Sequence, residues 1–485
     1  MICHSKGSET GFRAAVAALV LGLMLAAPAW PQAASLKLPP SKRVKLPNGM
    51  ALILVERHTV PMVSFHLALR AGAVADPPGR EGSAGLTAAL LRKGTKTRTA
   101  DKFSEELDFI GGTFDTFAGP DATTITSEFP KKDLAAGLDL FSDALMNPVF
   151  PAEEVTKLVR QWADGIRAWK DQPQAVIEIF FNGYLFGKHP YGRPNGGDEK
   201  SLATMTRDDI ANFYGTNYAP GNAILVVAGD FSTTDMEKLL TAKFTAWPAG
   251  KITTVNLPAP VPFQGKKLLL IDKPDATQTF FTIGNVGVAR SNPDRVALRV
   301  VNTLFGGRFT SMLNSELRIK TGLTYGARSA FDERRVPGPF YIATYTRNAT
   351  TEKAMDMALD VLKRLHEKGI TAEELASAKT YIKGQFPPTI ETADQIAAQL
   401  AALELYGLDE REINDLYATI DRMTLDDARR VIHQYYPLDN LVFVLIGKVS
   451  EVSGVVAKYA PRMDRRSISD PGFESEAAPA TRAPR

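Results

Sequence analysis

The sequence predicts an α+β protein made of two homologous α/β-sandwich halves of roughly 200 residues each. Three observations support this fold class. Strand-like alternation and helical spacing of apolar residues interleave without a regular βαβ order. One pattern occurs twice along the chain, and proline-rich stretches without periodicity follow each copy. We therefore expect helices packed on one face of a mostly antiparallel sheet in each half.

Length and composition agree with this organisation. The chain has 485 residues, which predicts two to four domains at ~150 residues per domain. Hydrophobic residues make up 44% and charged residues 23%, values that exclude a polytopic membrane protein, a collagen-like chain and a largely disordered one. The net charge of +3 is too even for a phosphate-binding surface, so we expect no nucleic-acid partner.

The first 29 residues have the three parts of a secretory signal peptide. A polar start carries Lys6 and Arg13, residues 14–27 are apolar, and Pro28-Ala29 follows. The apolar run is shorter than the ~20 residues that span a bilayer. We predict cleavage after Ala29 and export, with a periplasmic location.

Other interpretations of this leader stay open. Cleavage after Ala33 or Ala34, a misassigned start codon, and an uncleaved anchor are alternatives, and only the anchor would place the protein at a membrane. Cleavage would remove Cys3, the single cysteine of the chain. A chain without thiols suits an oxidising compartment, and it can form neither a disulfide nor a cysteine-based zinc site.

Proline-rich segments set the predicted domain boundaries. Residues 247–262 and the tail beyond Pro461 are rich in proline and lack periodicity. The predicted organisation is a signal peptide (1–29), an N-terminal domain (30–250), a linker (251–265), a C-terminal domain (266–460) and a disordered tail (461–485).

An internal repeat indicates that the two domains arose by duplication. Residues 138–141 and 151–155 match residues 359–362 and 371–375, at separations of 220 to 221 residues. A second match, 210 residues apart, pairs residues 106–112 with 316–322.

Periodicity predicts the individual elements in chain order. Residues 44–57 form strand-like runs around an Asn48-Gly49 hairpin turn. The further predicted elements are a strand at 63–71, helices at 81–92, 99–110, 134–146 and 153–168, and buried strands at 223–230 and 441–447.

No conventional active site is visible in the sequence. The chain has six histidines, and no two stand three to five residues apart, as a helical zinc motif requires. It also has no nucleophile elbow, phosphate-binding loop or acidic metal cluster. We expect His189, in a loop, and His433, near a helix end, to be surface or packing residues.

A series of short motifs nevertheless follows one order through both halves. The first half carries Asn48-Gly49, Asp76 ahead of a helix, and Lys93-Gly94-Thr95 at the end of that helix. Later motifs are His-Pro-Tyr-Gly at 189–192, Asn-Tyr-Ala-Pro-Gly-Asn-Ala at 217–223, Gly-Gly-Arg at 306–308 and the segment 316–325. In this order, the chain resembles the insulinase and pitrilysin zinc peptidases, in particular the short, processing-peptidase-like branch.

The resemblance fails at the catalytic motif. Active members of that family carry H-x-x-E-H shortly before the Lys-Gly-Thr segment. This chain has Gly85-Leu86-Thr87-Ala88-Ala89 there. The family's third zinc ligand falls near Asp164, which we interpret as a solvated helix residue. We therefore predict no catalytic residue, no metal ligand and no cofactor in this chain.

The family's substrate-holding residues are retained. The resemblance implies that Arg318 and Tyr325, seven residues apart, contact a peptide bound at the zinc of another domain. We expect Arg318 in the last turn of a helix that ends at Gly322, and Tyr325 at the start of the next strand. The alternative is a surface arginine and a tyrosine at the edge of the core.

The resemblance implies a non-catalytic, substrate-binding subunit of an exported heterodimeric zinc metalloendopeptidase that degrades or processes peptides. A homologous H-x-x-E-H subunit would supply the zinc, and the two subunits would close as a clamshell. One alternative is an inactive pseudopeptidase that serves as a structural or scaffold subunit of an envelope complex. A homodimer with an unrecognised activity is another.

Overall fold

The computed structural model describes residues 37–250 and 255–474. The predicted signal peptide, part of the predicted linker and the last eleven residues lie outside this part of the chain. From Leu38 onward the chain forms one compact unit, so both halves are described together. No helix within the described residues is both long and apolar enough to cross a bilayer.

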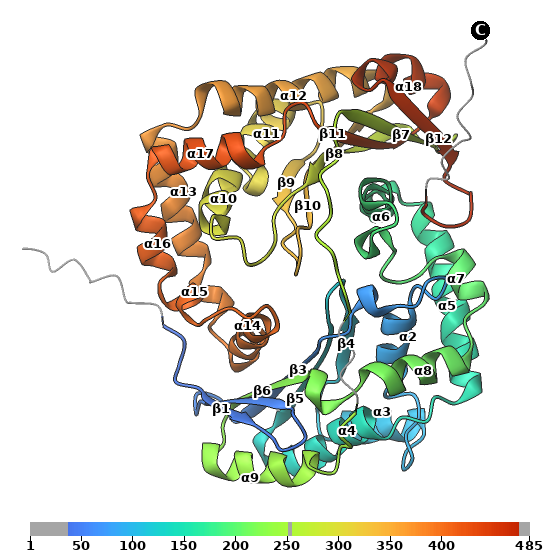
Figure 1. The fold of residues 1–485 in the computed structure, drawn as a ribbon, viewed down its shortest axis with the longest axis vertical. Helices are drawn as coiled ribbons and strands as arrows, with labels where there is room; N and C mark the ends of the chain where they lie inside the picture. Colours follow the sequence, from blue (N-terminus) through green and yellow to red (C-terminus); the bar gives the residue numbers. More distant parts are fainter. Residues whose placement is uncertain (1–36, 251–254, 475–485) are drawn as a thin grey trace, which may run out of the picture. The chain divides into compact units, whose positions relative to one another are not determined.

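The first sheet has six strands in the order β1-β2-β6-β3-β5-β4 (Figure 1). They are β1 (Lys42–Lys45), β2 (Ala51–Glu56), β3 (Met62–Leu69), β4 (Asp115–Ala118), β5 (Thr123–Pro130) and β6 (Ala223–Gly229). Strands β2 and β6 are parallel, and the other neighbouring pairs are antiparallel. The predicted Asn48-Gly49 turn joins β1 to β2, and Gly49 has a φ of 95° that favours glycine.

The second sheet repeats this arrangement in the order β12-β7-β11-β8-β10-β9. Its strands are β7 (Lys266–Asp272), β8 (Gln278–Val286), β9 (Ala327–Phe331), β10 (Pro339–Arg347), β11 (Leu441–Gly447) and β12 (Arg462–Ser467). Strand β7 is parallel to both β11 and β12, and the remaining pairs are antiparallel. Five strands of each sheet occupy equivalent places, which confirms the predicted two-half α+β fold.

Helices of the first half follow the predicted spans closely. They are α2 (Ser83–Leu90), α3 (Ala100–Phe109), α4 (Leu134–Met146), α5 (Ala152–Lys170), α6 (Pro173–Phe186), α7 (Glu199–Ala203), α8 (Arg207–Asn217) and α9 (Thr233–Phe244). Thr99 caps α3, because its side chain accepts a hydrogen bond from the backbone of Lys102. Helices α6 to α9 were not among the predicted elements.

Helices of the second half repeat much of this order. They are α10 (Arg295–Asn302), α11 (Met312–Asn314), α12 (Thr351–Lys368), α13 (Ala372–Gln385), α14 (Ala393–Leu405), α15 (Arg411–Asn414), α16 (Leu416–Arg422), α17 (Leu425–Tyr435) and α18 (Val449–Val456). Two π-helical segments, η5 (Thr303–Gly307) and η6 (Ser315–Lys320), follow α10 and α11. The repeated residues 138–141 and 359–362 lie in the equivalent helices α4 and α12.

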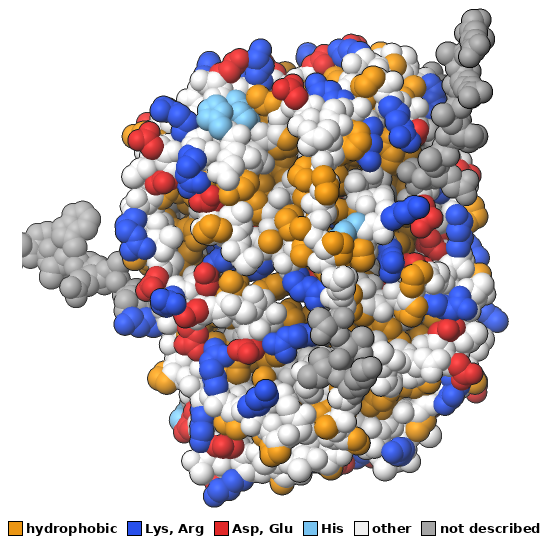
Figure 2. All heavy atoms as spheres, viewed as in Figure 1, with side chains coloured by type: hydrophobic (Ala, Val, Ile, Leu, Met, Phe, Trp, Pro, Cys, Tyr) orange, Lys and Arg blue, Asp and Glu red, His pale blue; other side chains and the backbone are white. Residues whose placement is uncertain are grey.

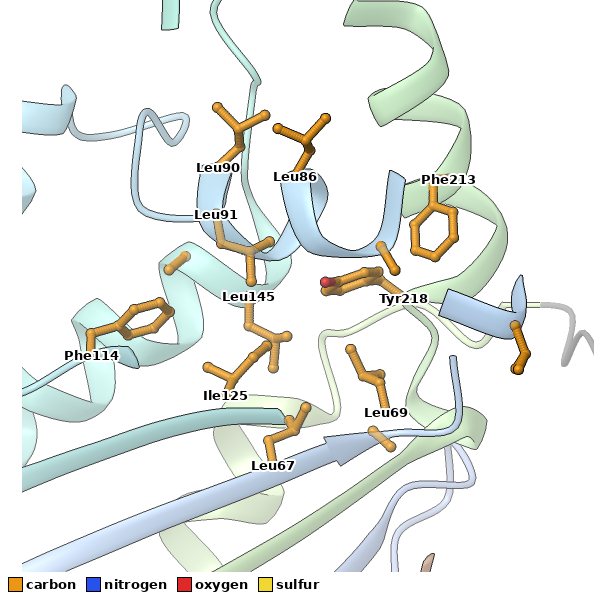
Figure 3. Close-up of a cluster of buried hydrophobic side chains, with 14 of the residues drawn as sticks. Leu67, Leu69, Leu86, Leu90, Leu91, Phe114, Ile125, Leu145, Phe213 and Tyr218 are labelled. Carbon is orange, nitrogen blue, oxygen red and sulfur yellow. The ribbon is translucent and has the colours of Figure 1, made fainter. Parts of the chain in front are cut away.

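The core of the first half lies between the sheet and helices α2, α4 and α8. Figure 3 shows Leu91, just past α2, directed toward Leu145 of α4, with Leu67 and Ile125 of the sheet below them. All four side chains are at most 1% exposed. This packing fixes α2, the helix in which the zinc motif of an active family member would lie.

Each sheet is also covered on its second face by a helix from the other half. Helix α14 packs on β3 and β6, and α6 packs on β8 and β11 (Figure 1). This explains why β6 and β11 are buried at every residue, as strands covered on both faces are. The sequence predicted helices on only one face of each sheet, and this part of the prediction was wrong because the second helix comes from the other half.

The predicted disordered tail is also wrong for residues 462–474. Strand β12 adds to the edge of the second sheet beside β7. Beyond it, Phe473 is 1% exposed and packs against Phe180 of α6, with ring centroids 5.0 Å apart. The proline-rich composition of this segment does not indicate the short strand β12 or the buried side chain of Phe473.

Candidate functional site

Helix α2 occupies the place of the family's zinc motif and is rigidly held at its start. The carboxylate of Asp76 accepts hydrogen bonds from the backbone N–H groups of Gly82 and Ala84, each at 2.8 Å. Asp76 is 3% exposed, and burial raises its pKa to about 8. Asp76, which the sequence analysis noted only as a motif residue, therefore positions the first turn of α2.

An indole ring lies directly over α2. A methyl carbon placed on Gly85 would be 2.7 Å from Cη2 of Trp162 and 3.0 Å from its Cζ3. Real carbon atoms do not approach this closely without a shift, so the ring of Trp162, on α5, fills the space that a side chain at position 85 would need. The sequence signal for this contact was the pair Trp162 and Trp169, seven residues apart on one face of α5.

The residues at this place do not fit a zinc ion. Gly85 and Ala89 offer no donor atom, and a structural or catalytic zinc site needs at least three protein ligands. Asp164 has 63% of its side chain exposed and pairs with Arg167 at 2.7 Å, which confirms that it is a solvated helix residue. Within residues 37–250 and 255–474, no three His, Cys, Asp or Glu side chains form a possible metal site.

A cavity of about 370 Å³ lies beside Gly85 and Ala89. Its walls are largely apolar and aromatic, and they come from α2, β4, α5 and α6 together with loops of both halves. The aromatic residues that line it are Phe117, Trp162, Trp169 and Tyr191. The cavity can accept an apolar side chain, because bulky aromatic walls favour such a group.

Two polar residues of the cavity, Arg334 and Tyr191, are paired with carboxylates. Arg334, from the second half, is 6% exposed, forms an ion pair with Asp332 at 2.6 Å and lies over the ring of Tyr191 at 4.7 Å. The Tyr191 hydroxyl donates to Asp121 at 2.6 Å, and burial together with that carboxylate raises the pKa of Tyr191. These groups join the two halves at the cavity and are not poised as an acid or a base.

Strand β4 forms one edge of the first sheet and borders the cavity. It pairs with β5 on one side, and no other strand among the described residues pairs with its outer side. Phe117 on this strand is 66% exposed. An edge strand next to an apolar cavity offers both main-chain hydrogen bonds and a side-chain pocket.

The two predicted substrate-holding residues lie together in the second half. The guanidinium carbon of Arg318 is 4.3 Å from the ring centroid of Tyr325 and 4.5 Å from that of Phe309. Tyr325 is 73% exposed and Phe309 is 58% exposed. Arg318 is therefore held between two aromatic rings at the protein surface.

Arg318 keeps its hydrogen-bond donors free. In the described part of the chain, no acceptor forms a hydrogen bond with its guanidinium and no carboxylate pairs with it. The nearby Glu316 is instead paired with Lys320 at 2.9 Å and with Arg364 at 3.0 Å. The structure thus presents an oriented, unpaired arginine.

The local structure agrees with the predicted placement in part. Arg318 lies near the end of η6, and Gly322 follows with a φ of 60°. Tyr325 lies in the loop two residues before β9 and not in the strand itself. The sequence analysis did not identify Phe309, although its position just after the Gly306-Gly307-Arg308 motif was a possible signal.

His189 has a structural role. Its ring accepts a hydrogen bond from the backbone of Tyr191 and bonds the carbonyl oxygen of Pro258 at 2.8 Å. Burial lowers the pKa of His189. The prediction that it is a packing residue is confirmed.

Two family models match the chain in succession. Residues 52–199 match the insulinase family, peptidase family M16, and residues 204–382 match the peptidase M16 inactive domain. The boundary between the matches, residues 200–203, falls within α7 of the first half.

Curated proteins and solved structures resemble the chain over most of its length. A Mycobacterium leprae protein named an uncharacterized zinc protease is 27% identical over 393 residues, which are 81% of this chain and 88% of that protein. A Streptomyces coelicolor protein of the same description is 26% identical and covers 80% of this chain and 86% of its own length. A Pseudomonas fluorescens structure described as a peptidase M16 inactive domain has a TM-score of 0.80 at 26% identity, covering 84% of this chain and 98% of its own.

Proposed function

Since this chain belongs to the insulinase family of peptidases, M16, we propose that it is the non-catalytic, substrate-binding subunit of an exported heterodimeric zinc metallopeptidase acting on peptides. The free, aromatic-stacked guanidinium of Arg318 carries this proposal. A guanidinium that is held by two exposed rings and makes no hydrogen bond to the described chain keeps its donors available to a ligand, which supports a binding role.

The geometry suits an extended peptide. The guanidinium of Arg318 can donate two parallel hydrogen bonds to a carboxylate, or hydrogen bonds that converge on one peptide carbonyl oxygen. The exposed Tyr325 hydroxyl can donate to the same carbonyl oxygen, where it would stabilise negative charge that develops as the carbonyl is attacked. Stacking holds the guanidinium in one plane, which lowers the entropy lost on binding.

The partner would supply all metal chemistry. Gly85, Ala89 and Trp162 leave no place for a catalytic zinc at α2, so in this proposal an H-x-x-E-H homologue supplies the zinc and the base glutamate. The relatives from Mycobacterium leprae and Streptomyces coelicolor are named zinc proteases, which agrees with a zinc-dependent assembly. Export by the N-terminal leader would place this assembly in the periplasm.

Co-purification and mutagenesis test the proposal. The tagged chain is recovered from the envelope fraction of its host, and zinc content and hydrolysis of an unstructured fluorogenic peptide are measured on the complex. We expect an H-x-x-E-H partner at equal stoichiometry. Arg318→Ala and Tyr325→Phe should each lower turnover by roughly 100-fold if an oxyanion contact is lost.

Lys320→Ala is the matched control. Lys320 is a cation on the same π-helical segment, but it is paired with Glu316, so its removal should leave turnover unchanged. A complex whose hydrolysis is insensitive to Arg318→Ala and Tyr325→Phe, or a homodimer without zinc or hydrolysis, would favour the scaffold role.

A further inference from the structure

Two histidines that are far apart in the sequence meet on the surface of the second half. His366 is in the last turn of α12, and His433 is in the last turn of α17. Their Nδ1 atoms are 3.3 Å apart, and the ring planes are inclined by 75°. His433 is exposed, and a pale-blue histidine patch lies over the place of α17 in Figure 2.

A backbone hydrogen bond sets the tautomer of His366. Its Nε2 is 2.8 Å from the carbonyl oxygen of Tyr436, an acceptor, so Nε2 carries the proton. The lone pair of the neutral ring is then on Nδ1, directed toward His433. Burial lowers the pKa of His366, and His433 lowers it further, which keeps the ring neutral at neutral pH.

This arrangement matches the requirements of a metal ligand pair. Metal-bound histidines commonly donate their second N–H to a backbone carbonyl, as His366 does to Tyr436. With metal–nitrogen bonds of ~2.0–2.1 Å, two donors of a tetrahedral site lie roughly 3.3–3.4 Å apart. The observed Nδ1–Nδ1 distance of 3.3 Å equals that edge, whereas it is long for a hydrogen bond.

Other described histidines lack this free pair of nitrogens. Both ring nitrogens of His58 contact carboxylates, at 2.5 Å for Asp230 and 3.0 Å for Glu56. Both ring nitrogens of His189 are bonded to backbone groups. Among the histidines that the structure describes, only His366 and His433 have ring nitrogens within 3.5 Å of each other.

We propose that His366 and His433 bind one divalent transition-metal ion that prefers imidazole nitrogen and accepts tetrahedral geometry, such as Zn(II), and that Cu(II), the tightest binder of such ligands, serves as the probe. Nitrogen ligands favour Cu(II) by the general order of stabilities. No third His, Cys, Asp or Glu of the described chain completes the site, so water fills the remaining positions and the ion exchanges readily. The ion would link α12 to α17 and is separate from the substrate-holding residues.

Copper titration of the full chain tests this site. The protein is made without a histidine tag and with Cys3→Ser and His4→Gln, so that its N-terminus offers neither thiol nor imidazole. CuSO₄ is added, and stoichiometry is followed by calorimetry and nitrogen hyperfine coupling by electron paramagnetic resonance. We expect one Cu(II) per chain with two imidazole nitrogens and a raised Tm.

The variants separate the proposal from its alternatives. His433→Gln, at an exposed position, should weaken Cu(II) binding by at least ~10-fold and abolish the rise in Tm, whereas the control His58→Gln should retain both. Equal Cu(II) affinity in His433→Gln, or a spectrum with one nitrogen or none, would show that the pair is only hydrogen-bonded. Peptide turnover by the complex should be unaffected by His433→Gln, so this result is independent of the proposed function.

Discussion

At the scale of single residues, the place of the zinc motif does not only lack ligands. It is filled by the side chain of Trp162. The indole occupies the space above Gly85, and Trp169 on the same helix face lines the adjoining cavity. A site that holds an ion needs converging donor atoms, whereas this one presents apolar walls. Restoring the ligands alone would therefore not restore the metal.

The variant Gly85→His/Ala89→His tests this conclusion. We expect no stoichiometric zinc by elemental analysis, and a loss of about 1–3 kcal/mol in the free energy of unfolding from overpacking against Trp162. Adding Trp162→Ala should recover part of that loss by removing the overlap. Ala89→His alone, at a partly exposed position, serves as the control and should cost less. Stable zinc binding by the double variant would contradict the packing argument.

Phe309 is a further single-residue test. Its ring centroid is 4.5 Å from the guanidinium carbon of Arg318, and a cation–π contact at an exposed site is worth about 0.5–1 kcal/mol. Phe309→Ala should therefore lower turnover of the complex by roughly 2- to 5-fold, which is far less than Arg318→Ala. A steady-state comparison of kcat and KM checks this, and a loss as large as that of Arg318→Ala would contradict a supporting role.

At the scale of elements, the side chains of strand β3 contact helices on both faces of the first sheet. Phe65 faces the helical layer, with its ring 5.4 Å from that of Phe141 on α4. His66, the next residue, points to the other face, where its Nε2 is 2.6 Å from a carboxylate oxygen of Asp394 on α14. The alternation of the strand thus joins the core of the first half to a helix of the second.

This contact predicts a dependence of stability on acid pH. The hydrogen bond from His66 lowers the pKa of Asp394 below its usual ~3.9, so the ionised carboxylate stabilises the folded state above ~pH 4. That contribution is lost as the pH falls through the lowered pKa. Urea unfolding at pH 7 and pH 3 should show a smaller acid loss in Asp394→Asn than in the unmodified chain. An identical pH dependence in both would exclude this contribution.

The elements differ in how well the sequence predicted them. Helices α4 and α5 and strands β3, β6 and β11 were predicted because their apolar spacing is regular, and Pro151 marks the start of α5. Helices α6 and α14 were not, although α14 has a Thr392 cap. Both helices are apolar over much of their surface because they pack on the sheet of the other half. The amphipathic pattern that identifies a helix with one buried face is therefore weak in both.

At the scale of the whole molecule, the segment after β12 joins the two halves. The Lys170 ammonium on α5 donates to the carbonyl oxygen of Asp470 at 2.8 Å and pairs with Glu199 at 2.5 Å. Glu199 in turn accepts from the backbone N–H of Gly472. This buried polar group, next to Phe473, fixes the end of the second half against helices of the first.

Truncation tests the importance of this segment. A chain that ends at Ala460 loses β12 and the Phe473 anchor, and loss of a buried phenylalanine side chain alone costs about 3–5 kcal/mol. A chain that ends at Glu474 keeps both and is the matched control, which should unfold at a higher Tm. Differential scanning calorimetry of the two truncated chains tests this expectation. Equal Tm values would show that residues 461–474 add no stability.

The sequence by itself determined the two-half α+β fold and the absence of an H-x-x-E-H motif, because periodicity, turn chemistry and motif order act over short distances along the chain. The family resemblance, and not spacing alone, implied a shared role for Arg318 and Tyr325. Only the tertiary structure decided that Trp162 fills the zinc position, that α6 and α14 cross to the opposite sheets, and that His366 meets His433. Each of these contacts joins residues on separate elements, and the packing of those elements, not local sequence, sets which side chains meet.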